Sequence, residues 1–241
     1  MMNLILPALL VTRRAGWAPL FASMGGEDRK DAMYIPQFNH VTDPAILHAL
    51  MQHFSFATLV TQHEGRPFAT HLPFLVEPEH GEQGRLLAHL AKANPQWTDF
   101  APGREALVIF QGPHTYISPS WYETQPSVPT WNYAVVHAYG VPRVLEDDVQ
   151  IAETLRRLVA THEEGFEEPW ALERVPADYL QTMKRGIVTF EMPIRRLEGK
   201  LKLSQNRSLA DRERVIAALA SRSEDGAQGV QALMQETLRP S

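Results

Sequence analysis

Hydrophobic residues gather in four short segments in the first half of the chain, at about 54–62, 66–76, 85–91 and 105–111. These segments are rich in Phe, Leu, Val, Ile and Thr, and turn signals such as Glu64-Gly65 separate them. Runs of this kind between turn residues predict strands. Because the alternation of strand and helix that a parallel sheet requires is absent here, we expect an antiparallel meander.

Predicted helices, whose hydrophobic residues recur at helical spacing, flank these segments. Thr42-Asp43-Pro44 is a helix start, with a capping side chain followed by proline, and Asp147-Asp148 starts another helix. The other predicted elements are a short helix at 94–100, strands at 133–145 and 186–196, a turn at 197–199, and helices near 209–221 and 227–238. We therefore predict a mainly β fold with flanking helices, built on a barrel of six or more strands.

Alternation along two of these strands places a histidine of each on the less apolar face. His71 lies there with Ala69, and His89 lies there with Ala91. Small neighbours leave room for a ligand against the strands, although a structural or surface role for each histidine is the alternative. The opposite face of the first strand is expected in the core, with Phe68, Thr70, Leu72, Phe74 and Val76.

Cations and amides follow two of the predicted strands. Lys92 and Asn94 follow His89 within five positions, and an ammonium with an amide can hold a phosphate at a strand end. A second basic cluster, Lys200 and Lys202 before a polar stretch, offers the same chemistry. Its alternative interpretation is a solvated edge strand whose lysines deter pairing.

An unusual segment rich in proline and large aromatic residues occupies 112–122 and 128–133. Proline fixes the backbone without donating a hydrogen bond, and Trp and Tyr present flat faces with one polar tip. We interpret this segment as the wall of a pocket for a planar aromatic ligand.

Composition excludes several classes of protein. The 241 residues carry a net charge of -5, which argues against a broadly basic nucleic-acid surface, and the chain has no cysteine for disulfides or thiolate chemistry. Glycine-rich nucleotide-binding motifs, HExxH motifs and histidines at metal-ligand spacing are absent, so we expect no metal. The apolar run at 4–11 is too short to span a bilayer, and the cytoplasm is the expected compartment.

Seven strings taken in order make the chain similar to the PaiB family of FMN-binding negative transcriptional regulators. They are Met33–Pro36, Phe56–Thr61, Thr70–Phe74, Ala88–Pro95, Gly112–Tyr122, Val128–Tyr133 and Lys202–Asn206. The resemblance runs from Met33 to about Leu219. It implies a split β-barrel of the FMN-binding type, and a homodimer with FMN at the subunit interface.

The resemblance also implies where the cofactor binds. Its first group of predicted contacts comprises Thr70, His71, Leu72, His89, Lys92 and Asn94, with Lys92 at the flavin phosphate. Its second group comprises the family hallmarks Trp131, Asn132, Lys202 and Gln205. No catalytic residue is assigned.

These predictions define a domain plan and three functional hypotheses. Residues 1–32 are expected to be a poorly ordered or upstream extension, 33–206 the FMN-binding domain with a helical insertion at about 147–182, and 207–241 helices packing on the barrel. The first hypothesis is an FMN-binding regulator or a flavin-linked oxidoreductase. The others are a haem-binding or haem-degrading protein, with His71, His89, His114 or His137 as axial ligand, and a DNA-binding repressor without active cofactor.

Overall fold

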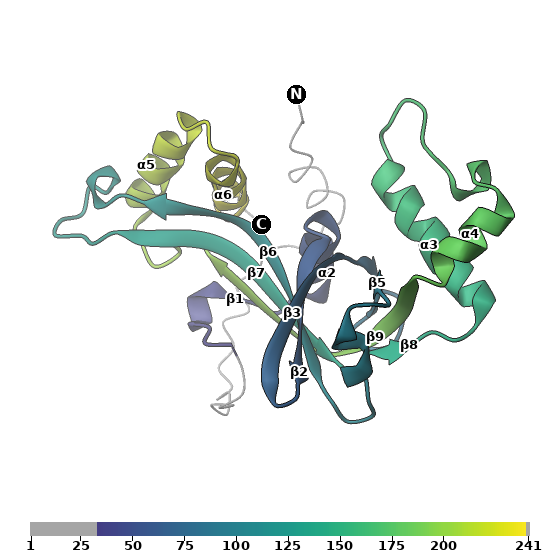
Figure 1. Cartoon of the computed structure of the whole chain (residues 1–241). Coiled ribbons are helices and arrows are strands. Elements are labelled where there is room, and N and C mark those ends of the chain that lie inside the picture. The colour runs from purple at the N-terminus through teal and green to yellow at the C-terminus, as the bar shows by residue number, and fades with distance from the viewer. Residues whose placement is uncertain (1–32, 240–241) are drawn as a thin grey trace. The chain divides into compact units, whose positions relative to one another are not determined.

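The structure is a computed structural model that describes residues 33–239, so the extension predicted for residues 1–32 lies outside the described residues. Within this part of the chain nine strands follow the hydrogen-bonded order β3-β2-β6-β7-β9-β5-β4, with β1 and β8 paired to β9 (Figure 1). They are β1 (His40–Val41), β2 (Phe56–His63), β3 (Arg66–Pro73), β4 (Leu75–Glu77), β5 (Arg85–Ala91), β6 (Ala106–Ile117), β7 (Thr130–Gly140), β8 (Arg143–Val144) and β9 (Ile187–Lys202). The pairs β2–β3, β2–β6, β4–β5 and β5–β9 are all antiparallel, as the sequence predicts.

Helices flank these strands and confirm the predicted mainly β class with flanking helices. The α-helices are α2 (Pro44–His53), α3 (Asp148–Glu163), α4 (Ala177–Lys184), α5 (Leu209–Ala220) and α6 (Asp225–Glu236). The short 3-10 helices are η1 (Gln37–Asn39), η2 (Pro95–Asp99), η3 (Pro119–Trp121) and η4 (Leu172–Arg174). Asp147 caps α3 as predicted, because its side chain accepts a hydrogen bond from the Gln150 amide.

Three elements differ from the sequence-based expectations. The strand predicted at 66–76 divides at Phe74, because β3 pairs with β2 whereas β4 pairs with β5. β6 runs on to Ile117, so the aromatic segment begins inside the sheet. The turn predicted at 197–199 is wrong, since β9 continues to Lys202. Gly199 serves a close approach there instead, because a Cβ at this position would lie 2.1 Å from the Leu47 side chain.

The described chain divides into two compact units, which we treat separately. Unit 2 comprises residues 50–110 and 137–197, and its core contains a chain of aromatic rings. Phe74 packs edge-on against Phe110 and Phe190 at centroid distances of 5.8 and 6.2 Å. On the outer face of its sheet, Leu75 and Leu87 pack with Leu145 and with Leu158 of α3.

Unit 1 comprises residues 33–49, 111–136 and 198–239, and α5 and α6 pack together within it. α6 lies directly on β6, because a Cβ on Gly226 would stand 2.4 Å from the His114 carbonyl oxygen and one on Gly229 would stand 2.6 Å from Pro113. Two glycines one helical turn apart thus allow this close contact. The fully buried side chains around it include Leu203, Val215, Leu219, Val230 and Met234.

Candidate functional site

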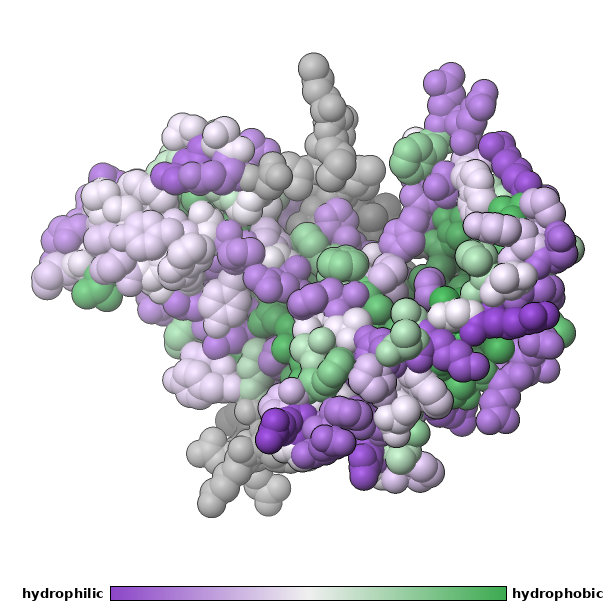
Figure 2. Space-filling view, in the orientation of Figure 1, coloured by the Kyte–Doolittle hydropathy of each residue, from purple (hydrophilic) through white to green (hydrophobic). Residues whose placement is uncertain are grey.

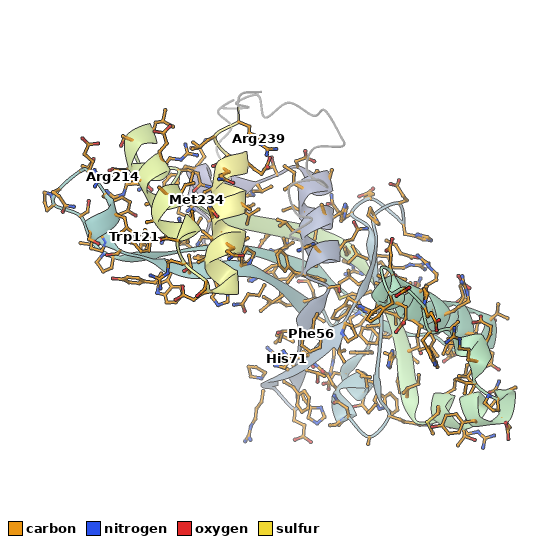
Figure 3. The ribbon with its side chains drawn as sticks, turned by 90° about the horizontal axis from the view of Figure 1, so that it is seen from above. Phe56, His71, Trp121, Arg214, Met234 and Arg239 are labelled. Carbon is orange, nitrogen blue, oxygen red and sulfur yellow. The ribbon has the colours of Figure 1, made fainter. Side chains whose placement is uncertain are left out.

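The outer side of β3 presents a histidine with one free ring nitrogen. His71 and Ala69 are exposed there, whereas Leu72 is buried. His71 Nδ1 shares a 3.0 Å hydrogen bond with the Thr58 hydroxyl, and Thr58 lies directly opposite His71 in the β2–β3 register. The Phe56 ring stacks on the imidazole at 6.4 Å between centroids (Figure 3). Within residues 33–239, Nε2 of His71 has no hydrogen-bond partner, so it is available to a ligand.

The turn after β5 is fastened to β3 by Asn94. The Asn94 side-chain nitrogen donates to the Thr70 hydroxyl at 2.9 Å, and its oxygen accepts from the Gln96 amide at 3.0 Å and caps η2. Gln96 is fully buried and donates to the carbonyls of Leu59 and Phe68, both at 3.2 Å. The polar groups of this turn therefore fix its position on the β2–β3 pair.

Lys92 has a fixed backbone and an unpaired side chain. Its amide donates to the Gly186 carbonyl at 2.8 Å, and its carbonyl accepts from the Trp97 indole nitrogen at 3.0 Å. The side chain is exposed, and in the described part of the chain its ammonium has neither an ion pair nor a hydrogen bond. A lysine with a fixed backbone, whose ammonium has no partner in the described part of the chain, is suited to bind an anionic group.

His89 is half-buried on β5, on the face that carries Leu87. Its Nδ1 and the hydroxyl of Thr189, its cross-strand neighbour on β9, are buried and lack hydrogen-bond partners among the described residues. Burial lowers the pKa of His89 below its ordinary value of 6.5, so the ring is neutral at physiological pH. Orphaned polar atoms on two paired residues mark a place where a ligand or water atom would be favourable.

The second predicted group lies in unit 1 and has mainly internal partners. Asn132 is fully buried, donates to Ser204 Oγ at 3.0 Å and contacts the sulfur of Met234 at 3.4 Å. Gln205 accepts from the Leu203 amide at 2.7 Å and donates to the Leu201 carbonyl. These bonds stabilise the turn after β9, where Ser204 has a φ of 62°.

The basic residues and the tryptophan of unit 1 differ in exposure. Lys200 is buried, donates to the Tyr34 carbonyl at 2.8 Å, and faces His40 of β1, so the alternative of a solvated edge strand is wrong. Lys202 is half-buried and donates to the Thr130 hydroxyl. Trp131 is 52% exposed, with the ring of His114 at 6.2 Å. Of the second group, Trp131 offers the largest open surface.

Sequence reasoning missed two polar clusters of unit 2. Asp99 of η2 is buried and binds the Thr61 hydroxyl at 3.1 Å and His63 Nδ1 at 3.0 Å. Around Glu77 and Glu191, three arginines converge from separate elements. The signal for the second cluster was a glutamate within each of two apolar strands. Two hollows described in unit 2 adjoin these clusters, and none of the predicted FMN contacts lines either one.

Comparisons with known proteins agree with one another. Residues 33–196 match a family described as "Putative FMN-binding domain". The protein named Protease synthase and sporulation protein PAI 2, from Bacillus subtilis (strain 168), is 37% identical over 207 residues, which is 86% of this chain and 99% of that protein. An uncharacterised protein of Emericella nidulans is 32% identical over 204 residues, covering 70% of this chain and 81% of its own.

Two solved structures resemble the fold. The flavocytochrome Anf3 from Azotobacter vinelandii has a TM-score of 0.52 at 16% identity, over 71% of this chain and 73% of its own. The FAD and haem binding protein from Mycobacterium smegmatis has a TM-score of 0.51 at 19% identity, over 68% and 73%. At these identities the likeness shows the fold alone, a split β-barrel of the flavin-binding type.

Proposed function

The chain belongs to the FMN-binding domain family and its cofactor is a flavin, and from this premise we propose that a homodimer of it binds FMN over β3 and the turn after β5. The 37% identity to the PAI 2 protein of Bacillus subtilis confirms the resemblance to the PaiB family. The flavin contacts in this proposal are the first predicted group, which comprises Thr70, His71, Leu72, His89, Lys92 and Asn94.

The observation that carries this placement is the ammonium of Lys92, which has no partner within residues 33–239. A flavin phosphate is a dianion near neutral pH, and charge-assisted hydrogen bonds are its strongest anchors. Lys92 is fixed by two backbone hydrogen bonds, and the Asn94–Thr70 bond fixes the turn beside it. The cation therefore needs little reordering to meet a phosphate, which lowers the entropic cost of binding.

The surroundings of Lys92 and His71 also fit a flat ring system. Ala69, Ala91 and Ala93 are exposed and carry only methyl groups, so they leave space above the backbone. His71 offers Nε2, which has no partner in the described part of the chain, as a polar contact, while Thr58 fixes the orientation of the imidazole. The isoalloxazine would supply hydride or electron chemistry, and these residues would supply placement and exclusion of water.

A second copy of the chain is the partner that β7 favours. Alternate side chains of this strand are only half-buried, and they are Tyr133, Val135, His137 and Tyr139. A row of aromatic and aliphatic side chains on one face of a strand is typical of an interface core. Light scattering should give twice the chain mass of 27.2 kDa. Val135→Asp should yield monomers, whereas Val128→Asp in an exposed loop should not; a monomeric wild-type protein contradicts the dimer.

The proposal also includes a role for this chain as a negative regulator of transcription, and the cytoplasm as its compartment. The resemblance to the PaiB family supports this part of the proposal. No helix within residues 33–239 is long and apolar enough to cross a membrane. The net charge of -5 favours regulation through a ligand over binding to DNA by a broad basic surface. A gel shift with the chain's own promoter, at stated salt, checks direct binding; sequence preference that survives moderate salt would instead support a DNA-binding repressor.

Flavin binding is tested by the absorbance spectrum of the purified protein and by titration of the apo-protein with FMN. We expect a flavin spectrum, or micromolar or tighter binding of added FMN. A colourless protein that fails to bind added FMN would refute the proposal. Titration with haem covers the second hypothesis, because a Soret band lost in His71→Ala or His89→Ala would favour haem over flavin.

A further inference from the structure

A buried ionic cluster lies on the outer face of unit 2. Glu77 of β4 and Glu191 of β9 each have side chains only 5% exposed, and Arg85 of β5 bridges them. Arg85 Nε donates to Glu77 at 2.7 Å and its terminal nitrogen donates to Glu191 at 2.6 Å. Buried carboxylates require such partners, because an unpaired buried charge is strongly unfavourable.

Two further arginines complete the cluster and leave it with excess positive charge. Arg157 of α3 donates to Oε1 of Glu77, and Arg143 of β8 donates to Oε1 of Glu191. All four carboxylate oxygens are therefore occupied, while three guanidinium groups face two carboxylates. Arg157 uses one terminal nitrogen for its bond to Glu77, so its remaining N–H groups can serve another acceptor.

A hollow of about 370 Å³ opens beside Arg157. Leu87 and Leu145 form its apolar floor, and Val149, which is 77% exposed, stands on α3 at its margin. In Figure 2 hydrophobic surface lies among hydrophilic side chains in the region where Figure 1 places α3. Glu153 also lines the hollow, but Arg156 neutralises it through bonds of 3.0 and 2.7 Å. The net positive charge thus faces an apolar surface.

We propose that this hollow binds a small molecule with one carboxylate on an apolar body, such as an aromatic or medium-chain carboxylic acid. The carboxylate accepts hydrogen bonds from the free N–H groups of Arg157, and the apolar body lies on Leu87 and Leu145. One excess charge matches a monoanion, whereas a dianionic phosphate would leave a negative charge against an apolar floor. The site does not depend on the flavin, because none of the proposed flavin contacts lines it.

The test is calorimetric titration of the full chain, saturated with FMN, with benzoate and octanoate as probes. Acetate and 1-octanol are the controls, since acetate lacks the apolar body and octanol lacks the charge. We expect saturable binding of the two probes and, for each control, at least about tenfold weaker binding, the size expected when a charged hydrogen bond or a comparable apolar contact is lost. Acetate equal to octanoate, or octanol equal to octanoate, would overturn the proposal.

Two variants locate the binding. Arg157→Gln should weaken benzoate binding by about tenfold or more, because it removes the charged donor. Since this change also breaks the bond to Glu77, Val149→Glu is the second variant; it leaves the cluster intact and places a negative charge at the margin. Arg174→Gln, an exposed arginine of η4, should bind as the wild type does. Unchanged binding in Val149→Glu, or no saturable binding by the wild type, refutes the site.

Discussion

The side-chain nitrogen of Asn94 donates a 2.9 Å hydrogen bond to the hydroxyl of Thr70, and this bond joins the turn after β5 to the middle of β3. The two residues are 24 positions apart, yet the resemblance assigns both to one flavin site. Thr70 is already engaged by Asn94, so its role is to hold the turn. Lys92, two residues before Asn94, has an ammonium with no partner among residues 33–239, so it can meet a ligand.

Replacement of Lys92 with alanine should weaken FMN binding by about 1–3 kcal/mol, the range for loss of a charged hydrogen bond. The fold should stay intact, because both hydrogen bonds at this residue come from its backbone. Fluorescence titration of FMN against apo-protein measures the affinity. Arg174→Ala, which removes another exposed cation, should leave the affinity unchanged. Equal affinity in Lys92→Ala and the wild type would remove Lys92 from the site.

Local pattern was sufficient for most of the fold. The capping residues Asp43 and Asp147 lie directly before α2 and α3, because a capping side chain acts within one turn of the helix. The error at 197–199 has the opposite cause. The sequence predicts a turn that includes Gly199, but the role of this glycine is set by Leu47, which is far away in sequence. A close approach between distant elements leaves no periodic signal in either of them.

The candidate site was predictable where one strand or one turn defines it. Alternation placed His71 on the open face of β3, and the Asn94-Pro95 pair marked the start of η2. The partners of Asn132 were not predictable, because Ser204 and Met234 come from segments 72 and 102 residues away. The arginine cluster around Glu77 was missed for the same reason, since its members come from five different elements.

Asn132→Ala should destabilise the chain while leaving FMN affinity per folded molecule unchanged. The change removes a buried amide and leaves the Ser204 hydroxyl without this partner, which costs about 1–3 kcal/mol. Urea unfolding followed by circular dichroism measures the loss. Asn206→Ala is the matched control, because Asn206 is exposed and should change stability by less than about 0.5 kcal/mol. Weaker FMN binding at unchanged stability would show instead that Asn132 contacts the cofactor.

Stability should fall in acid partly through Glu77. Burial raises the pKa of Glu77, but hydrogen bonds from Arg157 and Arg85 and their charges lower the pKa more, so it lies below the ordinary value of 4.5. The unfolded chain therefore takes up the proton first as pH falls. The stability that the Glu77 carboxylate contributes is complete above pH 4.5 and is lost as pH drops through the lower, folded pKa.

Urea unfolding of Glu77→Gln at a series of pH values checks this prediction. The difference in stability between the wild type and the variant should be largest near neutral pH and should shrink below about pH 4.5. Glu79→Gln, at an exposed position in the turn that follows β4, should reproduce the wild-type profile. A difference that stays constant from neutral pH into strong acid would mean that the Glu77 charge does not act through these arginines.

His89 should make stability depend on pH in a higher range. Because burial lowers its pKa below 6.5, the unfolded chain binds a proton before the folded chain does. Its contribution is therefore complete above about pH 6.5, falls as pH drops to the folded pKa, and changes no further below it. The pKa of His53 is also lowered by burial, so the prediction concerns the difference between wild type and a His89 variant, in which the His53 effect cancels.

The variant His89→Leu should give a flatter stability profile below pH 6.5, and should be as stable as the wild type or more so above that pH. Stability is retained there because leucine has no ring nitrogen, whereas Nδ1 of His89 is buried without a partner in the described part of the chain. His162→Leu, at an exposed position of α3, should keep the wild-type slope. The same slope in His89→Leu and the wild type would contradict a depressed pKa. Repeating the series with saturating FMN adds a second readout, because a flavin that bonds to His89 would bind the variant more weakly.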